Sequence, residues 1–104
     1  MSMEVITRKL IGLVEDELAD AIQKNGSFHS AHEAYAVLLE EWDEAIDDLK
    51  VVDDSIQCFW SCVKNDMGMD GEADILIQRS ISAAAELIQV AAMAKKYKQW
   101  EESR

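Results

Sequence analysis

The chain has 104 residues, no proline, four glycines and a formal net charge of −11 at pH 7, and 49% of its residues are hydrophobic. So much negative charge repels phosphate backbones and anionic surfaces, and we therefore expect neither nucleic acid nor a membrane among its partners. The length predicts one domain, residues 1–104, and abundant helix-forming residues without proline predict an all-α fold.

The first predicted helix covers residues 3–24. Its apolar residues recur at helical spacing: Val5, Ile6, Leu10, Leu13, Val14, Leu18, Ala21 and Ile22. Asn25 and Gly26 end this helix, because glycine readily adopts the left-handed conformation that follows a helix.

The second predicted helix begins at Ala31 and runs to about Asp66. Ser30 is its cap, and Glu33 completes a capping-box pattern. Apolar residues repeat along it in steps of four and three, which predicts packing on another helix: Leu38, Trp42, Ala45, Leu49, Val52, Ile56, Phe59 and Val63. Four aspartates on its other faces are expected to form a solvated surface: Asp47, Asp48, Asp53 and Asp54. Because a helix of roughly 50 Å is longer than a lone domain of this size needs, we expect a second copy to cover part of it.

A loop over residues 65–71 precedes the third predicted helix, which runs from Glu72 to about Gln99 or beyond. Its main face is apolar: Ile77, Ile81, Ala84, Ile88 and Ala91. Lys95, Lys96 and Lys98 are expected to serve as end-of-helix charges. For Lys95 and Lys96 the alternative is to steer a phosphate-bearing ligand. No secretory signal is visible, and no stretch approaches the length of a transmembrane helix. Cys58 and Cys62 lie one turn apart, where they do not readily form a disulfide, which favours a cytoplasmic protein.

Two acidic positions lie beside the apolar residues of the second helix. Glu41 and Glu44 are three residues apart and therefore project from one face. Carboxylates close to a packed face are costly unless a positive charge meets them, so a bound cation is one interpretation and a solvated surface is the other. Glu86 and Gln89 have the same spacing on the third helix. His29 and His32 flank the start of the second helix, where the alternatives are a contact with a ligand and an exposed polar contact.

Residues 40–44 read E-E-x-x-E, which resembles the first metal motif of the MazG-like all-α nucleotide pyrophosphohydrolases. The segment Phe28–Tyr35 resembles the lead-in to that motif in small phage-type relatives. The second motif of the family, E-x-x-D, is matched by Glu86 and Gln89, with glutamine in place of the acid. The resemblance covers roughly residues 27–97.

This resemblance implies a MazG-like helical bundle of three main helices, one of them long and central, completed by oligomerisation as a homodimer or homotetramer. It implies hydrolysis of a nucleoside triphosphate, NTP or dNTP, to the monophosphate and pyrophosphate with Mg²⁺ or, alternatively, Mn²⁺. The implied metal ligands are Glu41, Glu44, Glu86 and Gln89. Glu41 is also catalytic in this interpretation, and Glu40 either serves the nucleophilic water or faces solvent. The alternative is a non-catalytic acidic helical oligomer or adaptor with a degenerate metal site, which Gln89 and the long segment between the motifs favour.

Overall fold

In a computed structural model, the backbone is described for residues 1–104 and the side chains for every residue except Asp70. Over this described backbone the chain forms three α-helices and no strands: α1 (Met3–Asn25), α2 (Ala31–Lys64) and α3 (Asp70–Glu102). The all-α prediction is therefore confirmed. The sequence predicts one long central helix, whereas α2 and α3 have nearly equal lengths of 34 and 33 residues.

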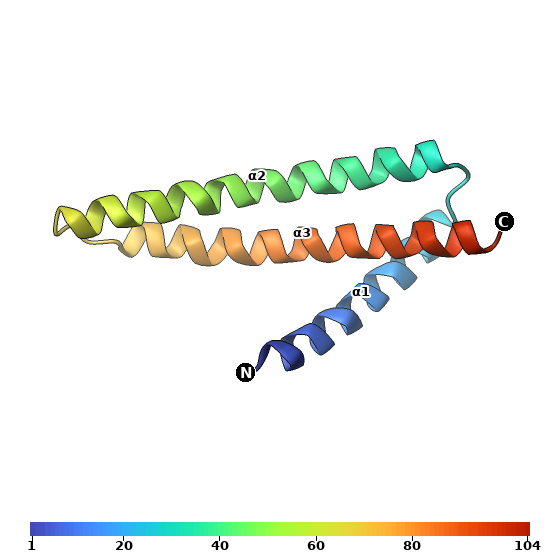
Figure 1. Ribbon diagram of the computed structural model, residues 1–104, viewed down its shortest axis with the longest axis horizontal. Coiled ribbons are helices and arrows are strands. Elements are labelled where there is room, and N and C mark those ends of the chain that lie inside the picture. The colour runs from blue at the N-terminus through green and yellow to red at the C-terminus, as the bar shows by residue number, and fades with distance from the viewer.

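The two long helices form an antiparallel hairpin, and α1 leans diagonally across the C-terminal half of α3 (Figure 1). The molecule is correspondingly elongated and flat, with extents of 60 × 30 × 19 Å. The loop between α1 and α2 lies beside the C-terminal end of α3 (Figure 1). All three helices therefore meet only at this end of the hairpin.

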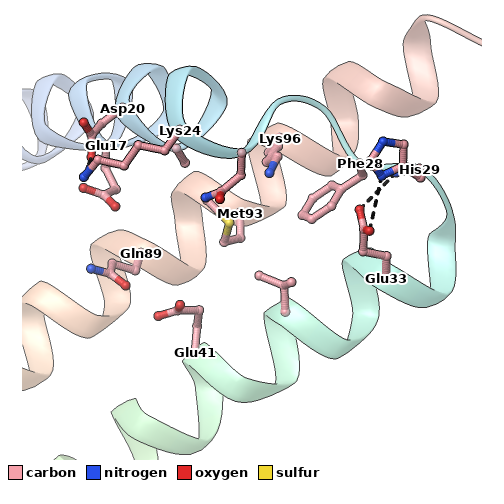
Figure 2. A pocket seen from close by; sticks show the side chains of 13 residues that line it. Glu17, Asp20, Lys24, Phe28, His29, Glu33, Glu41, Gln89, Met93 and Lys96 are labelled. Carbon is pink, nitrogen blue, oxygen red and sulfur yellow. Dashed lines mark hydrogen bonds and ion pairs between the residues drawn. The ribbon is translucent and has the colours of Figure 1, made fainter.

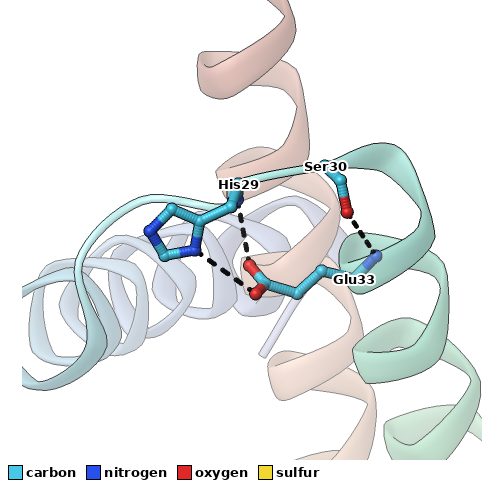
Figure 3. A network of polar contacts seen from close by, with 3 residues as sticks. All are labelled: His29, Ser30 and Glu33. Carbon is cyan, nitrogen blue, oxygen red and sulfur yellow. Dashed lines mark hydrogen bonds and ion pairs between the residues drawn. The ribbon is translucent and has the colours of Figure 1, made fainter.

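The start of α2 is fixed by the predicted capping residues (Figure 3). The Glu33 amide donates to Ser30 Oγ at 3.1 Å, and Glu33 Oε1 accepts from the His29 amide at 3.0 Å. The second bond reaches one residue further back than in the usual capping box, which pairs the glutamate with the cap residue itself. These contacts with His29 lower the pKa of Glu33. At the end of α1, Gly26 has φ +70° and donates to the Ile22 carbonyl at 2.8 Å.

The core is small and lies where the three helices meet. Its buried members come from all three helices and from the loop before α2: Leu18, Ala21, Phe28, Ala34, Ala92 and Met93. Tyr97 and Trp100 pack around it from α3. The far half of the hairpin, by contrast, lies beyond the reach of this core.

A polar contact joins α2 to α3 near the middle of the hairpin. Ser82 Oγ donates to Asp48 Oδ2 at 2.6 Å, and Arg79 Nη1 donates to Asp48 Oδ1 at 3.1 Å. The hydrogen bond from Ser82, followed by the contacts with Arg79, lowers the pKa of Asp48. Asp48 is only 7% exposed, so the prediction that it belongs to a solvated surface is wrong. The two partners on α3 compensate the cost of burying its charge.

The segment Gly71–Glu102 is long and apolar enough, by length and composition, to cross a membrane, with a mean hydropathy of 1.2 over its best window. The expectation that no stretch approaches this length therefore does not hold. The same helix lies alongside α2, which carries Asp47 and Asp54 on exposed positions. Charged side chains of this kind are expensive inside a bilayer.

Candidate functional site

Three glutamates converge between α2 and α3. Glu41 and Glu44 project from one face of α2, as their spacing predicts, and Glu86 faces them from α3. One carboxylate oxygen of each residue lies within 4.8 Å of those of the other two. The antiparallel packing of the hairpin therefore unites the E-E-x-x-E segment with the first acid of the second segment.

The cluster is electrostatically unfavourable without a counter-charge. Burial raises the pKa of Glu41, and the neighbouring carboxylates of Glu44 and Glu86 raise it further. Burial is also the largest cause of the raised pKa of Glu86, followed by its contacts with Glu44. Glu41 Oε2 is buried and has no hydrogen-bond partner among the side chains and backbone that the structure describes. An unpaired buried carboxylate oxygen is costly, so this position favours either a proton or a cation.

A pocket of about 390 Å³ lies beside this cluster, between α1, α2 and α3 (Figure 2). Glu41 and Gln89 face one part of it, and Phe28, Lys96 and the His29–Glu33 pair lie towards the other (Figure 2). The remaining wall comes mostly from α1 and from apolar side chains: Glu17, Asp20, Ala21, Lys24, Asn25, Val37 and Met93. The pocket therefore combines oxygen ligands, apolar surface and two lysines within a small space.

The predicted site residues occupy different places. Glu41 belongs both to the carboxylate cluster and to the pocket wall. Gln89 lines the pocket, so its amide faces the same space as the Glu41 carboxylate. Glu44 and Glu86 belong to the cluster, where Glu44 is exposed and Glu86 is half-buried. Glu40 is exposed on α2 and lies neither in the cluster nor in the described lining of the pocket.

Lys96 lines the pocket, although the sequence favoured an end-of-helix charge for it and left the steering of a phosphate-bearing ligand as the alternative. The third helix continues to Glu102, so Lys96 lies inside the helix, and it is only 6% exposed. Its Nζ lies 4.3 Å from the centre of the Phe28 ring. A buried ammonium on an aromatic face is a favourable cation–π contact. The sequence places Phe28 in the short segment between α1 and α2, but it does not reveal that Lys96 of α3 lies over the ring.

Lys24 reaches the same pocket from α1. Its Nζ lies 2.9 Å from Asp20 Oδ2, and this contact raises the pKa of Lys24. Lys24 and Asp20 lie one helical turn apart on an exposed face of α1. Lys24 therefore stays charged at neutral pH, and its ammonium group can leave Asp20 to contact another anion. His29 contacts Glu33 from the loop, with Nδ1 at 3.4 Å from Glu33 Oε2.

In comparisons with known proteins, the chain matches no protein-family model, no curated protein and no solved structure. The features that bear on function are the carboxylate cluster, the pocket beside it and the E-E-x-x-E segment, which carries two of the three carboxylates.

Proposed function

We propose that the protein is a Mg²⁺-dependent nucleoside triphosphate pyrophosphohydrolase of the MazG-like kind, which converts an NTP or dNTP to the monophosphate and pyrophosphate. The observation that carries the proposal is the buried Oε2 of Glu41, which has no hydrogen-bond partner among the described residues and has Glu44 and Glu86 within 4.8 Å through their own carboxylate oxygens. Three converging carboxylates with no positive partner among the described side chains offer the oxygen ligands and the negative charge that a divalent cation requires.

The donor set fits a hard divalent cation. Glu41, Glu44 and Glu86 offer carboxylate oxygens, and the side-chain oxygen of Gln89 can serve as a neutral fourth ligand from the pocket wall. Magnesium is usually held by one or two carboxylates together with substrate phosphates, and manganese accepts the same ligands. When bound, the metal would neutralise charge on the phosphates and lower the pKa of a coordinated water.

The remaining groups of the pocket suit a nucleotide. Lys24 and Lys96 supply positive charge for an anionic ligand, and Phe28, Val37 and Met93 supply apolar surface. A volume of about 390 Å³ lies in the range of small-molecule sites. In this proposal the lysines orient the phosphates towards Glu41, and the apolar wall excludes water from the opposite side of the ligand. Glu40 faces solvent, so Glu41 is the carboxylate best placed to position an attacking water.

The finer description of the fold belongs to the same proposal. A MazG-like bundle would be completed by further copies of the chain, as a homodimer or homotetramer, and the protein would act in the cytoplasm on soluble nucleotides. The elongated hairpin supports this assembly, because its far half has no third helix against it in a single chain.

Pyrophosphate release from a panel of ribo- and deoxyribonucleoside triphosphates, with and without Mg²⁺, tests the chemistry. We expect metal-dependent release that Glu41→Gln abolishes. The matched control is Asp47→Asn, which removes an exposed charge from the same helix outside the cluster. Metal-independent release, or full activity in Glu41→Gln, would contradict the proposed site.

The second candidate is a non-catalytic helical adaptor, and the observation that favours it is Gln89 in the place of an acid. Calorimetric titration with Mg²⁺ and Mn²⁺ separates the two candidates, because a degenerate site predicts no saturable heat. If the folded parent releases no pyrophosphate and Gln89→Asp does, the adaptor is the better description.

A further inference from the structure

Helix α2 carries two heptad-spaced rows of side chains. The row that faces α3, here called the inner seam, consists of Ala34, Leu38, Glu41, Ala45, Asp48, Val52, Ser55, Phe59 and Cys62. The row one residue further around the helix, here called the outer seam, consists of Tyr35, Leu39, Trp42, Ile46, Leu49, Asp53, Ile56, Trp60 and Val63. Both rows step by four and three, which is the spacing of a helix that packs lengthwise on another.

The outer seam is the more hydrophobic of the two although it faces away from α3. The buried members of the inner seam are small or polar, whereas eight members of the outer seam are large and apolar and Asp53 is its single polar member. Within it, Tyr35 is 66% exposed, Trp60 59% and Ile56 51%. Along α2, a lone chain would therefore bury small side chains and expose large ones, which reverses the usual distribution.

The total surface shows the same imbalance. The chain exposes 7385 Å² for a mass of 11.7 kDa, whereas a folded monomer of that mass exposes about 5,900 Å². Its radius of gyration is 17.5 Å, against about 13 Å for a compact domain of this length. Two copies that each lose the excess of roughly 1,500 Å² would bury about 3,000 Å² together, which is the size of an obligate homodimer interface.

We infer that the outer seam of α2 packs on the outer seam of a second copy, antiparallel, with a two-fold axis at Leu49. A two-fold interface uses the same patch on both chains, so the seam must complement itself. About Leu49 the antiparallel pairing sets Trp42 against Ile56 and Tyr35 against Val63, so that each bulky ring meets a smaller side chain.

A parallel pairing is less favourable for two reasons. It would bring Asp53 of one copy against Asp53 of the other, and two carboxylates in an apolar interface repel each other strongly. It would also place Trp42 of one copy opposite Trp42 of the other, so that two bulky rings meet at the same level. In the antiparallel pairing Asp53 lies near Ile46 of the other copy. Each Asp53 is then four residues from the axis, on opposite sides of it, so the two carboxylates are separated by roughly 12 Å along the helices.

The inferred interface leaves the pocket accessible. Successive residues of a helix are about 100° apart, so the outer seam turns away from Glu33, Val37 and Glu41, which face the pocket. No member of the outer seam appears in the described lining of the pocket. The inference rests on the assembly in the proposed function but not on its chemistry, and both can be tested separately because the mass of the particle requires no nucleotide.

Single-cysteine cross-linking tests the two-fold axis. In a background with Cys58→Ser and Cys62→Ser, Leu49→Cys should form a self-linked dimer on mild oxidation. Tyr35→Cys alone should not, whereas an equal mixture of Tyr35→Cys and Val63→Cys should cross-link. Self-linkage of Tyr35→Cys as efficient as that of Leu49→Cys would indicate parallel chains and overturn the inference.

The particle mass tests the interface itself. By light scattering after size exclusion, the parent should have at least twice the chain mass of 11.7 kDa, and Ile56→Glu should reduce it to that of one chain or unfold the protein. The matched control is Ile81→Glu, the same change at a 66% exposed isoleucine of α3, which should keep the dimer. A monomeric parent, an unchanged mass in Ile56→Glu, or dissociation by Ile81→Glu alone would overturn the inference.

Discussion

Replacing Glu41 by glutamine should stabilise the metal-free protein at neutral pH. The substitution keeps the shape of the side chain and removes the charge that burial and the neighbouring carboxylates disfavour. Because the pKa of Glu41 is raised from its usual value of 4.5, the folded protein binds this proton more tightly than the unfolded chain does. The contribution of the protonated carboxyl to stability is therefore complete below pH 4.5 and is lost as pH rises through the higher pKa of the folded state.

The size of the effect follows from the separation of the charges. Two unit charges 4.8 Å apart repel by about 0.9 kcal/mol at the dielectric constant of water and by about 3.5 kcal/mol at an effective value of 20. Glu44 is exposed and Glu41 is half-buried, so the lower part of this range applies. We expect Glu41→Gln to raise the free energy of unfolding by about 1–2 kcal/mol at pH 7 and by close to zero at pH 4.

Urea unfolding at both pH values, in the presence of a chelator, measures this difference. Asp47→Asn is the control, because it removes one negative charge from α2 outside the cluster and should change stability little at either pH. Added Mg²⁺ at a hundred times its dissociation constant should stabilise the parent by about 2.7 kcal/mol and the Glu41→Gln variant by much less. If Glu41→Gln destabilises the protein equally at pH 4 and pH 7, the carboxylate is not repelled by its neighbours and the electrostatic reasoning is refuted.

Four further predictions concern the cap of α2, the buried contact between α2 and α3, the pocket and the core. Ser30→Ala should lower the free energy of unfolding by about 1 kcal/mol in urea, because the 3.1 Å cap of α2 is lost, while Ser27→Ala in the preceding loop should have little effect. Asp48→Asn should lower the urea midpoint at pH 7, and by progressively less as pH falls from 3.8 to below the lowered pKa of the folded state, because the stability that the lowered pKa of Asp48 gives is present above the usual value and lost as pH falls through the folded value. Lys96→Met should raise KM for the triphosphate about tenfold, since one charge-assisted contact with the phosphates, of about 1.4 kcal/mol, is removed. The circular dichroism spectrum should stay unchanged, and an unchanged KM would exclude Lys96 from the substrate site. Phe28→Ala should destabilise the protein by about 3–5 kcal/mol in the same unfolding assay, because its ring lies in the core under the ammonium of Lys96.

Residues that depend on helical periodicity were predictable from the sequence, and residues that depend on the pairing of helices were not. The spacing of Glu41 and Glu44 places both on one face of any helix, and the capping pattern at Ser30 needs only local geometry. The burial of Asp48 requires Arg79 and Ser82 on another helix, so its neighbours in sequence could not reveal it. For the same reason the apolar residues of the second helix read as one row, whereas the packing of α3 divides them into an inner and an outer seam.

The candidate metal site and the inferred interface both follow from the distribution of side chains on α2, with small and charged residues towards α3 and large apolar residues on the outer seam. An oxygen-lined site between α2 and α3 requires the helices to approach closely, and the fully buried Ala45 permits this next to Glu41 and Glu44. Small and charged residues in the inner seam contribute little hydrophobic stabilisation, so the hairpin needs apolar burial elsewhere. The outer seam offers that burial only when another helix covers it. A chain prevented from pairing should therefore lose both its fold and its affinity for divalent cations, whereas a chain with a neutral Glu41 should lose the cation alone.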